Sequence, residues 1–228
     1  MNRVFDFTHA IVRRPGASVV SGLRAGGGAD PALEDVLAEH AGYVAALREA
    51  GLVVTELEPL EDYPDAIFVE DPALVFTQGA VVLRPGAPSR EAEGQFLRAE
   101  LAARFPVVLE QCEGHADGGD VLVMPDRAYI GLSARTDRRG AEALITLLDR
   151  LGIAAVVADT PAEVLHLKTA SSLIDEETVL ATRPLADSNG PPLFPGDAAA
   201  ENRSHFQRPS CCSGVAEVYS PSRMMTPS

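Results

Sequence analysis

The stretch DAIFVEDPALVF is the first part of the sequence whose side chains could do chemistry, because three carboxylates interrupt an apolar run. Asp65 opens the run, and Glu70 and Asp71 are consecutive between apolar neighbours. In a strand, one of two consecutive side chains points away from solvent, and a buried carboxylate needs a partner. A guanidinium group suits that role because it offers paired N–H donors to carboxylate oxygens. The alternative is a strand end whose carboxylates are solvated.

A second candidate is HADGGD, in which two glycines stand between Asp117 and Asp120. Such glycines allow close approach of the backbone or unusual torsion angles, although a plain Gly-Gly turn with an acidic cap would show the same pattern. His166 lies between leucines in LHLKT. It is the natural general acid or base, because histidine titrates near neutral pH. A satisfied core histidine is the alternative.

Two arginines, Arg90 and Arg135, occupy matching positions, each after a predicted hairpin and before a predicted helix. In a chain with a formal net charge of −14, two such guanidinium groups could hold a substrate carboxylate through paired hydrogen bonds. Solvated surface arginines are the alternative.

The elements that must position these residues follow from the spacing of apolar side chains. Helical spacing predicts helices over 31–49, 91–104 and 138–151, and glycine follows the first and the last of them. Short apolar runs between turn signals predict strands. These strands are expected at 8–13, 53–57, 66–69, 73–76, 80–84, 107–109, 120–124, 128–131, 154–157, 165–174 and 178–182.

The predicted elements repeat along the chain. Asp65, Asp117 and His166 each open a predicted hairpin, at intervals of 52 and 49 residues. The first two hairpins are each followed by a helix and a single strand. A period near 50 indicates radial or stacked repetition of one α/β unit. In a radial arrangement, polar residues at equivalent strand ends would converge on a central axis.

Composition excludes several classes of protein. The 228 residues are 46% hydrophobic and 23% charged, which is typical of a globular protein. The net charge of −14 argues against nucleic-acid and anionic-membrane partners but allows a small cationic substrate. No apolar run is long enough to span a bilayer, and the first residues lack a secretory signal. Three cysteines cannot form a disulfide framework, so we expect a cytoplasmic protein.

The pattern changes near Asp187. Residues 1–187 carry the whole net charge and all the predicted elements, and we interpret them as one domain. Residues 188–228 are rich in Pro and Ser, have balanced charges and show neither helical nor strand spacing. We expect a poorly ordered tail there, and a change of reading frame near Asp187 would explain it.

Five motifs occur in order with little insertion between them: DAIFVEDPALVF, VVLRPGAPSR, ADGGD, YIGLSART and VLHLKTA. With these motifs, residues 9–187 resemble the dimethylarginine dimethylaminohydrolase family of the guanidino-group-modifying (pentein) superfamily. The resemblance implies a five-bladed α/β propeller of ββαβ units, with the last blade or blades missing or replaced by the tail. It also implies hydrolysis of N-methylated arginine to citrulline and a methylamine, without metal or cofactor.

The resemblance also implies roles for single residues. His166 would be the general acid and base, and Asp117 the carboxylate that orients it. Three carboxylates would hold the guanidinium and neighbouring groups, two arginines would bind the α-carboxylate, and one backbone group would contact the α-amino end. The three carboxylates are those of Asp65, Glu70 and Asp71, the two arginines are Arg90 and Arg135, and the backbone group belongs to Leu23. The partner is then a small guanidino compound, and a homodimer stays open.

The nucleophile of the family comes from a Gly-Gly-x-x-Cys segment, which does not occur in these 228 residues. Cys112 precedes the ADGGD motif, and Cys211 and Cys212 follow Arg-Pro-Ser in the unpatterned tail. We therefore expect an amidine hydrolase by descent whose chain is inactive. Two other interpretations stay open: a non-catalytic protein that binds arginine analogues, and a relative of arginine deiminase or an amidinotransferase.

Overall fold

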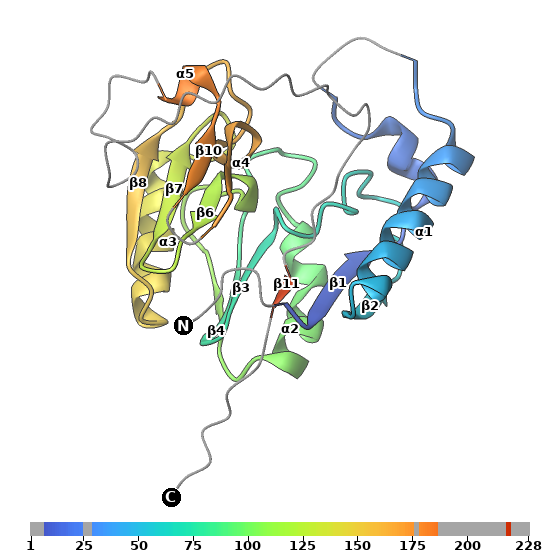
Figure 1. The fold of residues 1–228 in the computed structure, drawn as a ribbon, viewed down its shortest axis with the longest axis horizontal. Coiled ribbons are helices and arrows are strands. Elements are labelled where there is room, and N and C mark those ends of the chain that lie inside the picture. The colour runs from blue at the N-terminus through green and yellow to red at the C-terminus, as the bar shows by residue number, and fades with distance from the viewer. Residues whose placement is uncertain (1–6, 25–28, 176–177, 187–217, 220–228) are drawn as a thin grey trace, which may run out of the picture.

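Three three-stranded sheets of the computed structural model share one strand order (Figure 1). The structure describes residues 7–24, 29–175, 178–186 and 218–219. In the first sheet, β1 (His9–Arg13) runs parallel to β2 (Val53–Leu57) and antiparallel to β11 (Val218–Tyr219). The helix α1 (Leu33–Glu49) connects the two parallel strands, and the 3-10 turn η1 (Ala17–Ser21) precedes it.

The second and third sheets are complete ββαβ units. In each, two strands form an antiparallel hairpin, and a helix leads to a third strand parallel to the second. The second unit consists of β3 (Ala73–Phe76), β4 (Gly79–Val82), η2 (Glu93–Phe96), α2 (Arg98–Arg104) and β5 (Val108–Glu110). The third consists of η3 (Gly118–Asp120), β6 (Val121–Val123), β7 (Ala128–Leu132), α3 (Arg138–Arg150) and β8 (Ala155–Asp159). The repeated α/β unit predicted from the sequence is therefore confirmed in these two units.

A further hairpin follows the third unit. The short helix α4 (Leu167–Ala170) leads into β9 (Ser171–Leu173), which pairs antiparallel with β10 (Val179–Ala181). The helix α5 (Arg183–Ala186) comes next. Within the predicted tail, the structure describes only β11. For the rest of the tail, the expectation of poor order falls outside the described residues.

Clusters of buried apolar side chains join consecutive units. Leu144 and Leu148 of α3 pack with Ile130 of β7 and with Leu74 and Val81 from the second unit. All five side chains are fully buried, and each such burial stabilises the fold by about 1.5–3 kcal/mol. A second cluster joins α2 to the first sheet, and a third joins α4 to the third sheet. The units therefore lie side by side in chain order, as Figure 1 shows from α1 across to β8.

The long helices end where their sequences predict. Gly51 and Gly152 follow α1 and α3 with φ angles of 90° and 74°, which glycine adopts without strain. Asp137 caps the start of α3, because its side chain accepts a hydrogen bond of 2.7 Å from the backbone N–H of Gly140. The helix predicted over 91–104 is divided into η2 and α2.

Two of the predicted strands are wrong, and both adjoin expected site residues. Residues 66–69 form consecutive turns, in which Phe68 N–H donates to Asp65 O and Asp71 N–H to Phe68 O. The strand predicted over 165–174 begins only at Ser171, because the residues before it form α4. His166 therefore lies at the N-terminus of a short helix rather than inside a strand.

Among the residues that the structure describes, no helix is both long and apolar enough to cross a bilayer. The same residues contain no group of three or more His, Cys, Asp or Glu side chains placed to hold a metal ion.

Candidate active site

Arg90 is the centre of a buried ion-pair network. Its side chain forms ion pairs with Asp71 and with Glu93, whose Oε2 lies 2.7 Å from Nη2. The same Nη2 donates to the carbonyl oxygens of Asp65 and Phe68 at 3.2 and 3.1 Å. With 4% of its surface exposed, Arg90 has its donors committed to the protein. In this structure Arg90 holds the DAIFVED turns together, and its contact with a substrate carboxylate stays a prediction.

Asp65 connects these turns to the segment after η1. The backbone N–H of Leu23 donates a hydrogen bond of 2.9 Å to Asp65 Oδ1, and Asp65 is buried. The side chain of Leu23 is 50% exposed. Leu23 thus borders the expected site through its backbone, as the resemblance implies, but its amide N–H is already bonded to Asp65. Its contact with a substrate stays a prediction.

Asp71 and Asp117 form a buried carboxyl pair. Asp117 is fully buried; its Oδ1 accepts a 3.1 Å hydrogen bond from Gly119 N–H, and its Oδ2 has no hydrogen-bond partner among the described residues. Burial and the neighbouring Asp71 raise the pKa of Asp117 to about 8. Burial also acts to raise the pKa of Asp71, but Arg90 outweighs it and holds that pKa below its ordinary value. The two carboxyl groups therefore differ in the direction of their pKa shifts, upward for Asp117 and downward for Asp71.

His166 makes its carboxylate contact with Asp120. The distance from His166 Nδ1 to Asp120 Oδ2 is 3.1 Å, and the backbone N–H of Leu167 donates to Asp120 Oδ1 at 3.0 Å. Burial acts to lower the pKa of His166, but the hydrogen bond with Asp120 and the nearby carboxylates Asp117 and Asp71 raise it above its ordinary value. Asp117 Oδ1 is bonded to Gly119 N–H and Asp120 reaches the ring, so the expectation that Asp117 orients the imidazole stays a prediction.

The backbone around His166 explains why the sequence turns there. His166 N–H donates to Thr169 Oγ1 at 3.1 Å, and that hydroxyl donates to His166 O at 2.6 Å. These bonds begin α4 at the next residue. His166 is not one of the usual N-cap residues, so the sequence carried no clear signal for a helix start here.

Glu70 lies beside the end of α4. Its Oε2 forms an ion pair of 3.3 Å with Lys168 Nζ, and both side chains are partly buried. The resemblance placed Glu70 against a guanidinium group, and in this structure it faces a cation of the protein. Its contact with a substrate stays a prediction.

Arg135 differs from Arg90 although both follow a hairpin. It is half-buried in the loop after β7, and no ion pair joins its guanidinium group to a described residue. The two loops touch, since a Cβ placed on Gly86 would lie 2.2 Å from Arg135 O. Its contact with a substrate carboxylate stays a prediction.

The two glycines of HADGGD bring the carboxylates and the imidazole together. A Cβ on Gly118 would lie 2.0 Å from Glu70 O, and one on Gly119 would lie 2.9 Å from His166 Cγ. Gly118 N–H also donates to Asp71 O at 2.9 Å. The glycines allow close approach of the backbone here, one of the two roles that the sequence suggested. A continuous series of contacts thus runs from Leu23 to His166.

Two residues that sequence reasoning left without a role belong to this cluster. Glu93 is three residues after Arg90, a spacing that favours ion pairs in helical turns. Asp120 ends the HADGGD motif itself, but its position there did not distinguish it from Asp117.

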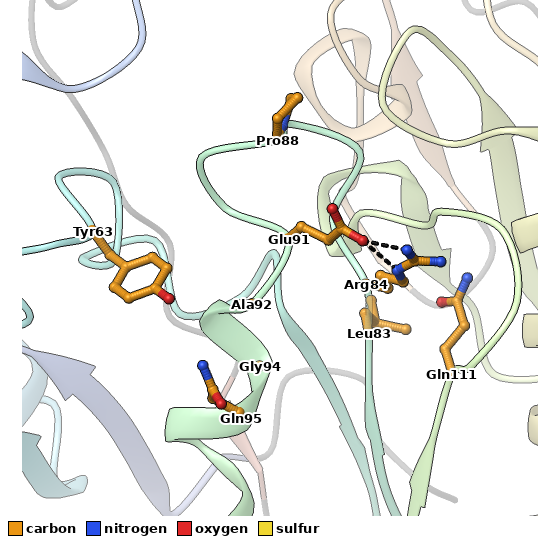
Figure 2. A pocket seen from close by; sticks show the side chains of 9 residues that line it. All are labelled: Tyr63, Leu83, Arg84, Pro88, Glu91, Ala92, Gly94, Gln95 and Gln111. Carbon is orange, nitrogen blue, oxygen red and sulfur yellow. Dashed lines mark hydrogen bonds and ion pairs between the residues drawn. The ribbon is translucent and has the colours of Figure 1, made fainter.

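A cavity of about 410 Å³ is lined in part by Glu91, Ala92, Gly94 and Gln95, at the start of η2 (Figure 2). The ion pair between Arg84 and Glu91 stands on one side of it and Tyr63 on the other, with Gln95 below. None of the expected site residues lines this cavity.

The fold and the site define the class of protein. An arginine deiminase family model matches residues 59–194. A Cys-to-Ser variant of dimethylarginine dimethylaminohydrolase from Pseudomonas aeruginosa, complexed with citrulline, superimposes with a TM-score of 0.74 at 34% identity, covering 78% of this chain and 70% of the other. The N-terminal domain of ArgZ, an arginine dihydrolase, shares the fold with a TM-score of 0.68 at 17% identity, covering 79% and 68%. The chain thus has the α/β fold of the penteins.

Sequence relatives define the family within that class. The dimethylarginine dimethylaminohydrolase of Pseudomonas aeruginosa is 36% identical over 177 residues, which is 77% of this chain and 69% of the relative. The protein of that name from Streptomyces coelicolor is 38% identical over 190 residues, which is 82% and 72% of the two chains. The chain belongs to the dimethylarginine dimethylaminohydrolase family.

Proposed function

We propose that this chain carries the catalytic framework of a dimethylargininase-type amidine hydrolase, which converts N-methylated arginine to citrulline and a methylamine. The observation that carries the proposal is the buried His166–Asp120 pair packed against the carboxyl groups of Asp71 and Asp117. A cationic guanidino substrate suits this site, because a guanidinium group offers paired N–H donors to carboxylate oxygens.

The chemistry divides into two steps. A thiolate attacks the guanidinium carbon, and the tetrahedral adduct expels methylamine, which takes its leaving proton from His166. Water then loses a proton to His166 as it attacks the thiouronium carbon, which releases citrulline and the thiol. A histidine whose pKa is raised above its ordinary value is protonated in a larger share of molecules at neutral pH, which favours the first proton transfer.

The nucleophile is the part of this mechanism that no described residue supplies. Cys112, the one cysteine in the described part of the chain, is exposed, and its Sγ lies 3.8 Å from Glu110 O. It belongs to none of the contacts around His166. We infer that these 228 residues alone release no citrulline, in line with the lack of a Gly-Gly-x-x-Cys segment.

Citrulline release from asymmetric dimethylarginine, measured by chromatography, tests the proposal. We expect none from the chain itself, and citrulline from a fusion in which the C-terminal part of the Pseudomonas aeruginosa relative follows Ala186. His166→Ala in the fusion should abolish that activity. A fusion that folds but forms no citrulline would refute the hydrolase assignment, and one that prefers unmethylated arginine would favour a deiminase. Activity of the chain itself would refute our inference about the nucleophile.

Binding separates the hydrolase from a non-catalytic binding protein. Calorimetry with citrulline or dimethylarginine should show binding to the chain, and Asp71→Asn should abolish it if the DAIFVED turns hold the guanidino group. Unchanged binding by Asp71→Asn would remove that carboxylate from the ligand site. Binding without any activity in the fusion would favour the non-catalytic alternative.

We further propose that the ββαβ units are sectors of a five-bladed propeller with its last blade or blades missing. Residues 1–187 would form one domain and 188–228 a tail, of which β11 pairs with β1. The repeated strand order of the three sheets supports the sector arrangement. We also propose a cytoplasmic protein, with a homodimer as its candidate assembly. The net charge of −14 favours a small cationic ligand over nucleic acid.

A further inference from the structure

The cavity beside η2 has a buried floor and an exposed rim (Figure 2). Its walls come from η2 and from the segments that follow β2, β4 and β5. Leu83, Gly94 and Gln111 are buried, whereas Pro88 and Gln95 are exposed. The volume of about 410 Å³ falls within the range of about 300–1,000 Å³ that is typical of small-molecule sites. The cavity is therefore large enough for a small ligand to reach the buried floor.

Gln111 brings an unsatisfied acceptor to this floor. Its side chain belongs to a residue that is 7% exposed, and its backbone N–H donates to Val82 O at 2.9 Å. Gln111 Nε2 donates to Glu113 O at 3.0 Å, which fixes the amide, because the reverse orientation would set Oε1 against that carbonyl oxygen. Gln111 Oε1 then has no hydrogen-bond partner in the part of the chain that the structure describes. A buried acceptor left in this state costs about 1–3 kcal/mol, which a donor from a ligand would offset.

The ion pair beside Gln111 leaves one donor group and one acceptor unused. Arg84 contacts Glu91 Oε1 through Nε, at 2.6 Å, and through Nη2. His115 Nε2 lies 3.8 Å from the same oxygen. Arg84 Nη1 and Glu91 Oε2 therefore form no hydrogen bond or ion pair with another described residue. Figure 2 shows the amide end of Gln111 directed toward the Arg84 guanidinium group, so these groups face one region of the cavity.

These groups select a neutral ligand that both donates and accepts hydrogen bonds. Gln111 Oε1 and Glu91 Oε2 only accept, and Arg84 Nη1 only donates. An ammonium or guanidinium ion offers no acceptor to Arg84 and meets its positive charge, and a carboxylate offers no donor to Gln111. The charges of Arg84 and Glu91 sum to zero, so a charged ligand would be desolvated here without a counter-charge of its own. A primary carboxamide or ureido group carries N–H donors and a carbonyl acceptor together.

We propose that this cavity binds a small neutral molecule through a primary carboxamide or ureido group. The N–H groups of the ligand donate to Gln111 Oε1 and Glu91 Oε2, and its carbonyl oxygen accepts from Arg84 Nη1. The apolar remainder of the ligand lies on Leu83. None of the expected catalytic or substrate-binding residues lines the cavity. The site is thus a property of the folded chain and is measured without hydrolase activity.

Proton–nitrogen NMR of the full chain, titrated with butyramide or propylurea, tests the proposal. Molecules with so few atoms should bind with millimolar affinity. We expect saturable shifts of the Gln111 side-chain amide and of the Gly94 backbone N–H, which line the floor. The signal that Gln111→Met removes assigns the side-chain amide. If neither probe shifts these signals up to its solubility limit, the cavity is a hydration site only and the proposal is wrong. Shifts confined to the surroundings of His166 would also overturn it.

Three probes of similar size separate hydrogen bonding from simple burial. N,N-dimethylbutyramide has no N–H donor, butyrate has no donor and a negative charge, and propylguanidinium has no acceptor. Each should bind about tenfold more weakly than butyramide or less tightly still, because Gln111 Oε1 or Arg84 Nη1 stays unpaired. Any of the three binding as tightly as butyramide, within the error of the titration, would refute the proposed recognition.

Two glutamine variants localise the binding. Gln111→Met removes the acceptor but keeps much of the side-chain volume, and it should weaken butyramide binding about tenfold. Gln78→Met is the matched control: Gln78 is exposed in the turn between β3 and β4, at the opposite end of β4 from Arg84, and its loss should leave the affinity unchanged. Equal affinities of the two variants would contradict the proposal. If Gln111→Met does not fold, the probe series decides the question on the unsubstituted protein.

Discussion

Replacing Arg90 by methionine distinguishes a structural arginine from a substrate-binding one. Methionine keeps much of the side-chain volume but removes the charge and every donor. The change leaves the carboxylates of Asp71 and Glu93 buried without their cation, and it removes the donor shared by the carbonyl oxygens of Asp65 and Phe68.

The magnitude follows from these lost contacts. Removing one partner of a buried ion pair costs about 3–5 kcal/mol of the free energy of unfolding, because an uncompensated charge stays buried. The free energy of unfolding of a typical domain is about 5–15 kcal/mol in total, so Arg90→Met should lose a large part of its stability. Arg135→Met is the matched control: no ion pair joins Arg135 to a described residue, and we expect a loss of about 0.5 kcal/mol.

Urea denaturation followed by circular dichroism measures both variants, since the chain has no tryptophan for fluorescence. Arg90 holds the pKa of Asp71 below its ordinary value, so this stabilisation is present above the unfolded-state pKa and is lost as pH falls through the folded-state value. The difference between Arg90→Met and the unsubstituted protein should therefore shrink below about pH 4.

The reasoning would be refuted if the free energy of unfolding of Arg90→Met lay within about 1 kcal/mol of that of Arg135→Met, a difference on the order of the experimental scatter between variants. If such a variant had also lost ligand binding, Arg90 would be the carboxylate-binding residue that the family resemblance implies.

Two other predictions concern the HADGGD turn. The pKa of Asp117 is raised to about 8 in the folded state. Between about pH 4 and pH 8 the folded state therefore holds a proton that the unfolded state has released. As the pH rises through this range, the free energy of unfolding should fall by up to about 1.4 kcal/mol per pH unit. Asp117→Asn should flatten that decline in urea denaturation at pH 5, 6.5 and 8, and an unchanged slope would place the titration elsewhere. Gly119→Ala should destabilise the fold by about 1–3 kcal/mol, because its Cβ meets His166. Gly42 lies on α1, and a Cβ there would meet nothing within 4 Å, so Gly42→Ala should instead stabilise the fold by about 0.5–1 kcal/mol. Equal effects of Gly119→Ala and Gly42→Ala on the free energy of unfolding would argue against the packing of the His166 ring on Gly119.

Local patterns were sufficient for the elements with strong apolar periodicity. The helices α1 and α3 and the hairpins around β4 and β7 lie close to the predicted ranges, because turn residues and apolar spacing act within a few residues of the chain. Apolar runs without periodicity were ambiguous. Residues 66–69 form turns because the carbonyl oxygens of Asp65 and Phe68 bond to Arg90, which comes more than twenty residues later.

The residue types of the site were likewise present in the motifs. Carboxylates and a histidine at a period near 50, with two arginines at matching positions, are the basis for predicting a centre that binds a guanidino group. Spacing could not assign their roles, since Asp117 and Asp120 are three residues apart and equally acidic.

Tertiary structure decided which side chain faces which partner. Arg90 and Arg135 follow equivalent hairpins, yet the DAIFVED turns enclose the first and leave the second half-buried. His166 approaches Asp120 rather than Asp117 because α4 begins against the Gly-Gly backbone, where a side chain on either glycine would collide. The sequence by itself determined which chemical groups the site contains. Their burial and mutual orientation, which set charge and proton position, depend on contacts between segments distant along the chain.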